Sequence, residues 1–191
     1  MISTFTAFFD ANIFYSVMRT SPVIYLARTK LFRAPWRERV HDEWTDAVAR
    51  KRGIDPGKLA VLRYDINAAI PDCIVSGFED IEQGLDLPDP DDRHVLAAAI
   101  TGGADLVVTC NLKHFPADKL APFGMEALHP DQFLANQLDL APDLFVAAVK
   151  DDIAHYENPK PDLNTYVGWL RRAELADTAN LIENLRVVID P

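Results

Sequence analysis

The chain has 191 residues, of which 49% are hydrophobic and 25% are charged. This balance is typical of a soluble protein with one medium-sized domain, or with one domain and a small appendage. No apolar stretch approaches the roughly 18 residues that a membrane-spanning helix needs, and the N-terminus lacks the basic and small-residue features of a signal peptide. Two cysteines, Cys73 and Cys110, are too few for a structural zinc site, and we expect reduced, buried thiols and a cytoplasmic location.

The first predicted element is a buried strand. Residues 4–10 (TFTAFFD) combine apolar, aromatic and β-branched side chains and predict a strand that ends at Asp10. Asn12 is a suitable N-cap for the helix that follows. Pro22 then predicts a break, with a separate short helix over residues 23–32.

Two longer helices and a second strand come next. Residues 37–53 repeat apolar side chains at a helical period, and Gly53 suits the C-terminal end of this helix. Asp55 and Pro56 occupy the cap and first-turn positions of another helix. Residues 72–78 (DCIVSGF) predict a short strand.

Residues 88–100 (PDPDDRHVLAAAI) place three aspartates ahead of an apolar run. They predict a loop and then a helix from about Asp91 to Thr101, which two glycines end. Residues 104–110 (ADLVVTC) predict a nearly all-apolar strand, and residues 124–130 (GMEALHP) are a candidate for one more.

Strands that alternate with helices and are too apolar for a half-exposed sheet predict an α/β fold. Its central parallel sheet should be flanked by helices on both sides. After His129 the chain is typical of helices broken by prolines, with no strand candidate before residues 186–189 (RVVI). We therefore predict an α/β domain at residues 1–130 and a helical extension at residues 131–191.

The net charge of −10 is unevenly distributed. Between Arg19 and Arg63 there are eleven Lys or Arg residues and five Asp or Glu residues. From Tyr64 onwards there are eight Lys or Arg residues and twenty-three Asp or Glu residues. The basic third of the chain, with its Arg-Lys-Arg run at residues 50–52, could offer a surface to phosphate groups. Charge alone fits an ordinary solvated helix face better.

Acidic side chains gather where ligands bind in such folds, beyond the carboxyl ends of parallel strands. Asp10 follows the first strand, Asn111 follows a later one, and Asp91 and Asp92 begin a helix, while Glu43 lies within another helix. Like charges buried together repel one another unless cations neutralise them. Oxygen ligands without cysteine or closely spaced histidines favour Mg²⁺ or Mn²⁺ over Zn²⁺.

Four motifs occur in an order and at spacings that resemble PIN-domain ribonucleases: FDANIFYS, a helix with HDEW, DPDDRHVLAAAI and VVTCNLKHFP. Within that family, the chain resembles the VapC-type toxins of bacterial toxin–antitoxin pairs. The resemblance covers about residues 4–130. The helical tail is similar, more loosely, to the extension of a longer-chain VapC-like subgroup.

The resemblance implies metal ligands at Asp10, Glu43 and Asp92, with Asp92 preferred to Asp91. The fourth acidic position of the family falls on Asn111, whose amide brings no charge. It is therefore open whether Asp89, Asp91 or Asn111 completes the site, and whether one metal ion binds or two.

The activity implied is that of a Mg²⁺-dependent endoribonuclease, with Mn²⁺ as a possible substitute, which cleaves phosphodiester bonds by metal-activated water. RNA would be the substrate, a cognate antitoxin protein the partner, and the protein a homodimer away from membranes. Two alternatives stay open. A catalytically inactive PIN-like interaction module is compatible with Asn111, and a receiver or phosphoaspartate-type domain would need a second aspartate where this chain has Asn12.

Several other residues have structural interpretations. Asn12 and Thr109 are expected to hydrogen-bond the neighbouring carboxylates or backbone. His114 is interpreted as a packing residue and not as a catalytic base. The three tryptophans are interpreted as core or interface anchors: Trp36, Trp44 and Trp169.

Overall fold

The structure is a computed structural model that describes residues 5–36, 38–70, 74–157 and 159–190. It divides into two compact units. The first contains residues 1–15 and 32–129, and the second contains residues 16–31 and 130–191. No helix among the described residues is long and apolar enough to cross a membrane.

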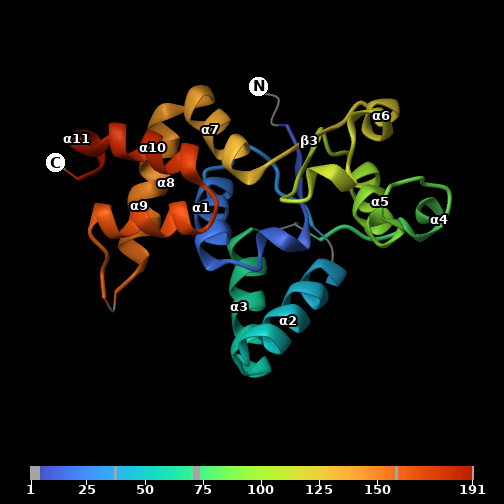
Figure 1. Ribbon diagram of the computed structural model, residues 1–191, viewed down its shortest axis with the longest axis horizontal. Helices are drawn as coiled ribbons and strands as arrows, with labels where there is room; N and C mark the ends of the chain where they lie inside the picture. Colours follow the sequence, from blue (N-terminus) through green and yellow to red (C-terminus); the bar gives the residue numbers. More distant parts are fainter. Residues whose placement is uncertain (1–4, 37, 71–73, 158, 191) are drawn as a thin grey trace. The chain divides into compact units, whose positions relative to one another are not determined.

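The first unit is built around a parallel sheet of three short strands in the order β1-β2-β3 (Figure 1). Phe8 of β1 lies opposite Val107 of β2, which lies opposite Ala127 of β3. The strands are β1 (Ala7–Phe9), β2 (Leu106–Val108) and β3 (Glu126–Leu128). The predicted α/β fold with a parallel sheet is therefore confirmed.

Helices and short 3-10 turns connect these strands. Among the described residues they are η1 (Ala11–Ile13), α2 (Glu38–Arg52), α3 (Pro56–Ala69), α4 (Glu79–Glu82), η2 (Pro90–Asp92), α5 (Arg93–Thr101), η3 (Leu112–His114), α6 (Ala117–Leu120) and η4 (Ala121–Phe123).

Helix α5 is the main apolar support of the sheet. Its residues from His94 to Ala99 are all buried, and those from Val95 to Ala99 share one hydrophobic core with Phe8 and Val107 of the sheet. A helix that is apolar around most of its circumference is typical of a core position. The helix that begins directly after Asp92 is therefore held firmly against the strands.

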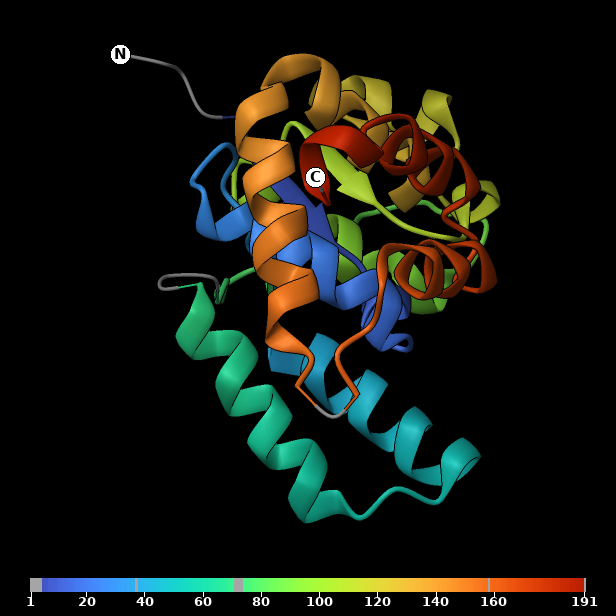
Figure 2. The same cartoon turned by 90° about the vertical axis from the view of Figure 1, so that its left-hand side faces the viewer.

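Helices α2 and α3 lie side by side as an antiparallel pair (Figure 2). Gly53 ends α2 with a left-handed φ of 62°, and the Asp55 side chain caps α3 by accepting a bond from the Lys58 N–H. In the N-terminal half of α2, the Trp44 indole N–H donates to His41 Nδ1 at 2.8 Å. Nε2 of the same ring lies 2.8 Å from the Trp36 indole nitrogen and 2.7 Å from Oδ1 of Asn67 on α3.

The second unit is helical. Its helices are α1 (Val17–Arg28), α7 (Pro130–Leu140), α8 (Pro142–His155), α9 (Leu163–Arg172), α10 (Ala176–Asn184) and α11 (Arg186–Ile189). Helix α1 packs against α8 and α9. The fully buried Asp152 of α8 joins the three helices, because it accepts hydrogen bonds from Ser21 of α1 and from the Tyr166 hydroxyl of α9. Burial raises the pKa of Asp152.

Several predicted elements are different in the structure. Helix α1 continues through Pro22, which is buried, so the predicted break there is wrong. Proline removes the bond to the carbonyl of Met18, and the apolar packing of α1 outweighs that loss. Residues 186–189 form a helical turn and not a strand, since no sheet edge in the described part of the second unit is available to pair with them.

The predicted strand at residues 72–78 is reduced to one bridge. Residues 71–73, with Cys73, lie outside the described residues, and Ile74 forms an isolated parallel bridge with Trp36. Cys110 is half-buried, and not fully buried as expected. Trp36 and Trp44 are fully buried, which confirms them as core anchors.

Candidate metal centre

Asp10 lies at the carboxyl end of β1 and is only 5% exposed. Its backbone N–H donates to the Val108 carbonyl at 3.1 Å, which fixes the chain beside β2. Its Oδ2 accepts a hydrogen bond from the Thr109 hydroxyl at 2.7 Å and another from the Asn12 amide. The carboxylate is therefore held in one orientation, and the predicted roles of Asn12 and Thr109 are confirmed.

Asn12 is not the helix cap that the sequence suggested. It lies within η1, and its Oδ1 accepts a bond from the Cys110 backbone N–H at 3.0 Å. Ser16 is the N-cap residue of α1. The Asn12 side chain instead bridges the ends of two neighbouring strands, which is possible because parallel strands end at the same edge of the sheet.

Three carboxylates influence one another electrostatically at this edge. Burial raises the pKa of Asp10 to about 6, and the negative charges of Asp92 and Glu43 contribute to the rise, although the hydrogen bond from Thr109 opposes it. We call Asp10, Glu43 and Asp92 the acidic centre. The structure thus brings two predicted residues, Glu43 of α2 and Asp92 of η2, within electrostatic reach of a third, Asp10, which follows β1.

The aspartates before α5 have different roles. Asp89 caps η2, because its Oδ1 accepts a bond from the Asp91 N–H at 3.1 Å. Asp92 is half-buried, and its Oδ2 lies 2.6 Å from Nδ1 of His114. Burial raises the pKa of Asp92, although the hydrogen bond from His114 opposes this effect. One aspartate therefore serves as a cap, and Asp92 faces the site.

His114 lies beside two of these aspartates. Its Nδ1 is 3.5 Å from Asp89 in addition to its contact with Asp92. Among the described residues, Asp89, Asp92 and His114 form a group whose potential ligand atoms all lie within 4.8 Å of one another. His114 is therefore more than the packing residue that the sequence suggested. Its sequence position, 22 residues after Asp92, gave no local signal of this pairing.

Glu43 is held from two sides. Its Oε1 lies 2.9 Å from Nε of Arg39 on the same helix and 2.9 Å from Nε2 of His94 on α5. His94 was not among the predicted site residues, because a histidine in an apolar helical run is indistinguishable in sequence from an ordinary core residue.

Asp91 and Asn111 are both exposed. The backbone N–H of Asn111 donates to the Thr109 hydroxyl at 3.0 Å. In the described part of the chain, no hydrogen bond or ion pair joins either side chain to the acidic centre. Their participation in the site stays a prediction.

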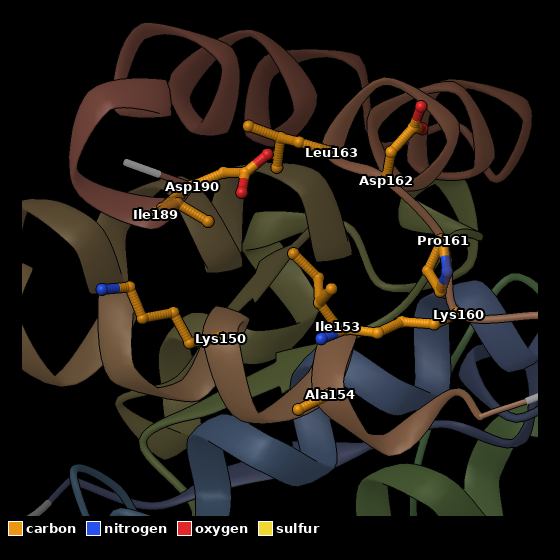
Figure 3. Close-up of a pocket in the computed structure, with 9 residues that line it drawn as sticks. All are labelled: Lys150, Ile153, Ala154, Lys160, Pro161, Asp162, Leu163, Ile189 and Asp190. Carbon is orange, nitrogen blue, oxygen red and sulfur yellow. The ribbon is translucent and has the colours of Figure 1, made fainter.

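A cavity of about 370 Å³ lies within the second unit (Figure 3). Figure 3 shows that its walls come from α8, the segment that enters α9, and the end of α11. The residues that line it are Lys150, Ile153, Ala154, Lys160, Pro161, Asp162, Leu163, Ile189 and Asp190. The cavity includes none of the predicted site residues.

Comparisons with known proteins cover both parts of the chain. Residues 6–113 match the family described as PIN domain, and residues 130–184 match the family described as VapC50 C-terminal domain. The protein named "Putative ribonuclease VapC50" of Mycobacterium tuberculosis (strain ATCC 25618 / H37Rv) is 50% identical over 68 residues. The match covers 36% of this chain and only 40% of that relative. No solved structure matches the chain significantly.

Proposed function

This chain belongs to the PIN-domain family, and on that premise we propose that it is a metal-dependent endoribonuclease and the toxin of a toxin–antitoxin pair. The observation that carries the proposal is the buried Asp10, whose pKa is raised to about 6 by burial and by its acidic neighbours. A cluster of carboxylates that cannot ionise together without cost favours a bound cation.

The donor set fits a hard divalent ion. The acidic centre offers carboxylate oxygens, and Nδ1 of His114 hydrogen-bonds the one on Asp92. Carboxylate oxygens suit Mg²⁺ and Mn²⁺, and Asp92 is common to the acidic centre and to the group with Asp89 and His114. The bound ion would supply an activated water and would stabilise charge on the leaving oxygen of a phosphodiester.

The chain's own residues supply orientation. Thr109 and Asn12 hold the Asp10 carboxylate, and His114 holds that of Asp92. Side chains fixed before the ligand arrives lose less conformational freedom when they bind it. None of these groups has to act as a covalent nucleophile.

Tyr15 lies close to the acidic centre and also to basic residues at the end of α2. Burial raises the pKa of Tyr15, the three carboxylates of the acidic centre raise it further, and the charge of Arg50 lowers it. Tyr15 also lies beneath the Lys51 ammonium, which is 6.0 Å from the centre of its ring. We infer that residues 50–52 at the end of α2 bind RNA phosphates and offset the repulsion from the acidic centre.

We also propose a cognate antitoxin as the protein partner, whose cationic side chain would neutralise the acidic centre as a metal ion does. The homodimer and the cytoplasmic location stay predictions.

The catalytically inactive module remains the second candidate, because the fourth acidic position of the family is the neutral Asn111. The receiver-type alternative is not carried further, since the chain belongs to the PIN-domain family.

The test of the function is divalent-dependent cleavage of RNA by the purified chain. We expect cleavage with Mg²⁺ or Mn²⁺, no cleavage with EDTA, and recovery when Mg²⁺ is restored. A preparation of D10N, purified in parallel, controls for contaminating nucleases. If the wild-type chain binds RNA but leaves it intact with every divalent ion, the inactive module is the better account.

Replacing Asn111 with aspartate is expected to tighten Mn²⁺ binding in the absence of RNA. A carboxylate near the ion adds a full negative charge in place of a dipole, and we expect roughly a tenfold gain in affinity. The stability of the metal-free protein should fall, because another like charge joins the acidic centre. Calorimetric titration of both proteins measures the difference. Equal affinities would mean that Asn111 points away, and that Asp89 or Asp91 completes the site.

A further inference from the structure

Arg39 and His94 both bond the Glu43 carboxylate, and they differ greatly in character. The Arg39 side chain is 49% exposed and lies one turn away on the same helix, whereas Glu43 itself is 29% exposed. Exposed pairs of this kind contribute little to fixing a side chain, because water and salt screen them. His94, by contrast, is only 3% exposed and comes from a different helix.

His94 is well placed to fix the position of Glu43. It is the second residue of α5, within the buried run that packs in the core of the first unit, so its ring is confined. Its Nε2 faces a carboxylate oxygen at 2.9 Å, and the hydrogen of that contact must come from the ring. Only one residue separates His94 from Asp92, so the start of α5 supplies a carboxylate to the acidic centre and also a donor to a second carboxylate.

We propose that His94 is a positioning residue of the metal centre, which holds the Glu43 carboxylate of α2 at a fixed place beside Asp10 and Asp92. The proposal rests on the proposed function, because it assumes that the acidic centre binds a divalent ion. A glutamate has three rotatable side-chain bonds, and without a buried donor it would have to be ordered when the ion binds. His94 therefore acts through Glu43 and does not touch the ion.

The test is Mn²⁺ affinity measured by calorimetric titration of the full chain without RNA. Loss of an outer-shell hydrogen bond commonly weakens metal binding by roughly 10-fold or more, and we expect this for H94L. H94Q should retain affinity close to that of the wild type, because the glutamine amide can donate from nearly the position of Nε2. Melting temperatures of all variants show whether they are folded, and H94M replaces H94L if that variant is not.

Arg39 supplies a matched control on the same carboxylate oxygen. R39Q also removes a donor to Glu43 Oε1, but it removes a positive charge near the ion as well. Its Mn²⁺ affinity should therefore be unchanged or slightly tighter. If R39Q weakens binding as much as H94L does, the exposed pair positions Glu43 and the proposal for His94 is wrong.

A double-mutant cycle tests whether His94 acts through Glu43. In an E43Q background, the change to H94L should weaken Mn²⁺ binding much less than it does in the wild type. An undiminished effect in that background, or wild-type affinity in H94L alone, would overturn the proposal. If the wild-type chain binds no Mn²⁺ with or without RNA, the proposed function itself fails, and the two failures are thereby distinguished.

Discussion

Replacing Asp10 with asparagine is expected to abolish RNA cleavage and at the same time to stabilise the metal-free protein near pH 8. The folded-state pKa of Asp10 is raised from 3.8 to about 6, so the folded chain binds this proton more tightly than the unfolded chain does. The stability of the wild type should therefore be highest below pH 4, decline as the pH rises to about 6, and stay low above it. The decline from this group is on the order of 2–3 kcal/mol.

An asparagine at position 10 carries no charge at any pH, and its amide oxygen can still accept bonds from Thr109 and Asn12. The stability advantage of D10N over the wild type should thus be close to zero at pH 4 and largest at pH 8. Urea unfolding in EDTA at both pH values measures it. D46N, which changes an exposed aspartate of α2, should show no such difference. If the difference in unfolding free energy between D10N and the wild type is the same at pH 4 and at pH 8, the pKa of Asp10 is not raised.

D10N also tests whether the Asp10 carboxylate is needed for RNA cleavage and for Mn²⁺ binding. Loss of one carboxylate ligand should reduce cleavage by roughly a thousandfold or more, since the ion and its activated water would be poorly held. Added Mn²⁺ should raise the melting temperature of the wild type more than that of D10N. Cleavage at the wild-type rate by D10N would remove Asp10 from the site.

The acidic centre was predictable to the extent that it follows from strand ends. Asp10 and Thr109 each lie just beyond an apolar strand, and parallel strands bring such positions together whatever the remaining sequence is. The donors to Glu43 and Asp92 were not predictable in this way. His94 and His114 reach their carboxylates across the fold, at sequence separations of 51 and 22 residues, and neither spacing corresponds to one turn of a helix.

The fold shows a similar limit. Local signals identified the helix that Asp55 caps and the glycine that ends α2, because both depend on neighbouring residues. The placement of α1 with the C-terminal helices had no local signal. It depends on packing that joins Ser21 to Asp152, across 131 positions of the chain. The helix break predicted at Pro22 was wrong for the same reason, because tertiary packing outweighed the local preference of proline.

Replacing Asp131 with alanine is expected to destabilise the second unit by roughly 3 kcal/mol. Asp131 is buried at the start of α7, yet it caps a different helix, α10. Its carboxylate accepts bonds from the backbone N–H groups of Asp177 and Thr178, each at 2.8 Å, and from the Thr178 hydroxyl at 2.7 Å. Alanine would leave these donors without their acceptor in a largely buried place. Asparagine keeps one acceptor oxygen, so D131N should lose less stability.

The chain offers a matched control for this prediction. Asp143 is the second residue of α8 and follows a proline, as Asp131 does in α7, but it is exposed. Each aspartate meets the positive end of its own helix, a contribution of about 0.3–1 kcal/mol. D143A should therefore cost no more than that, and urea unfolding followed by circular dichroism compares the two variants. If D131A and D143A are equally stable, the charge of Asp131 acts only on its own helix, and the bonds to α10 contribute nothing measurable.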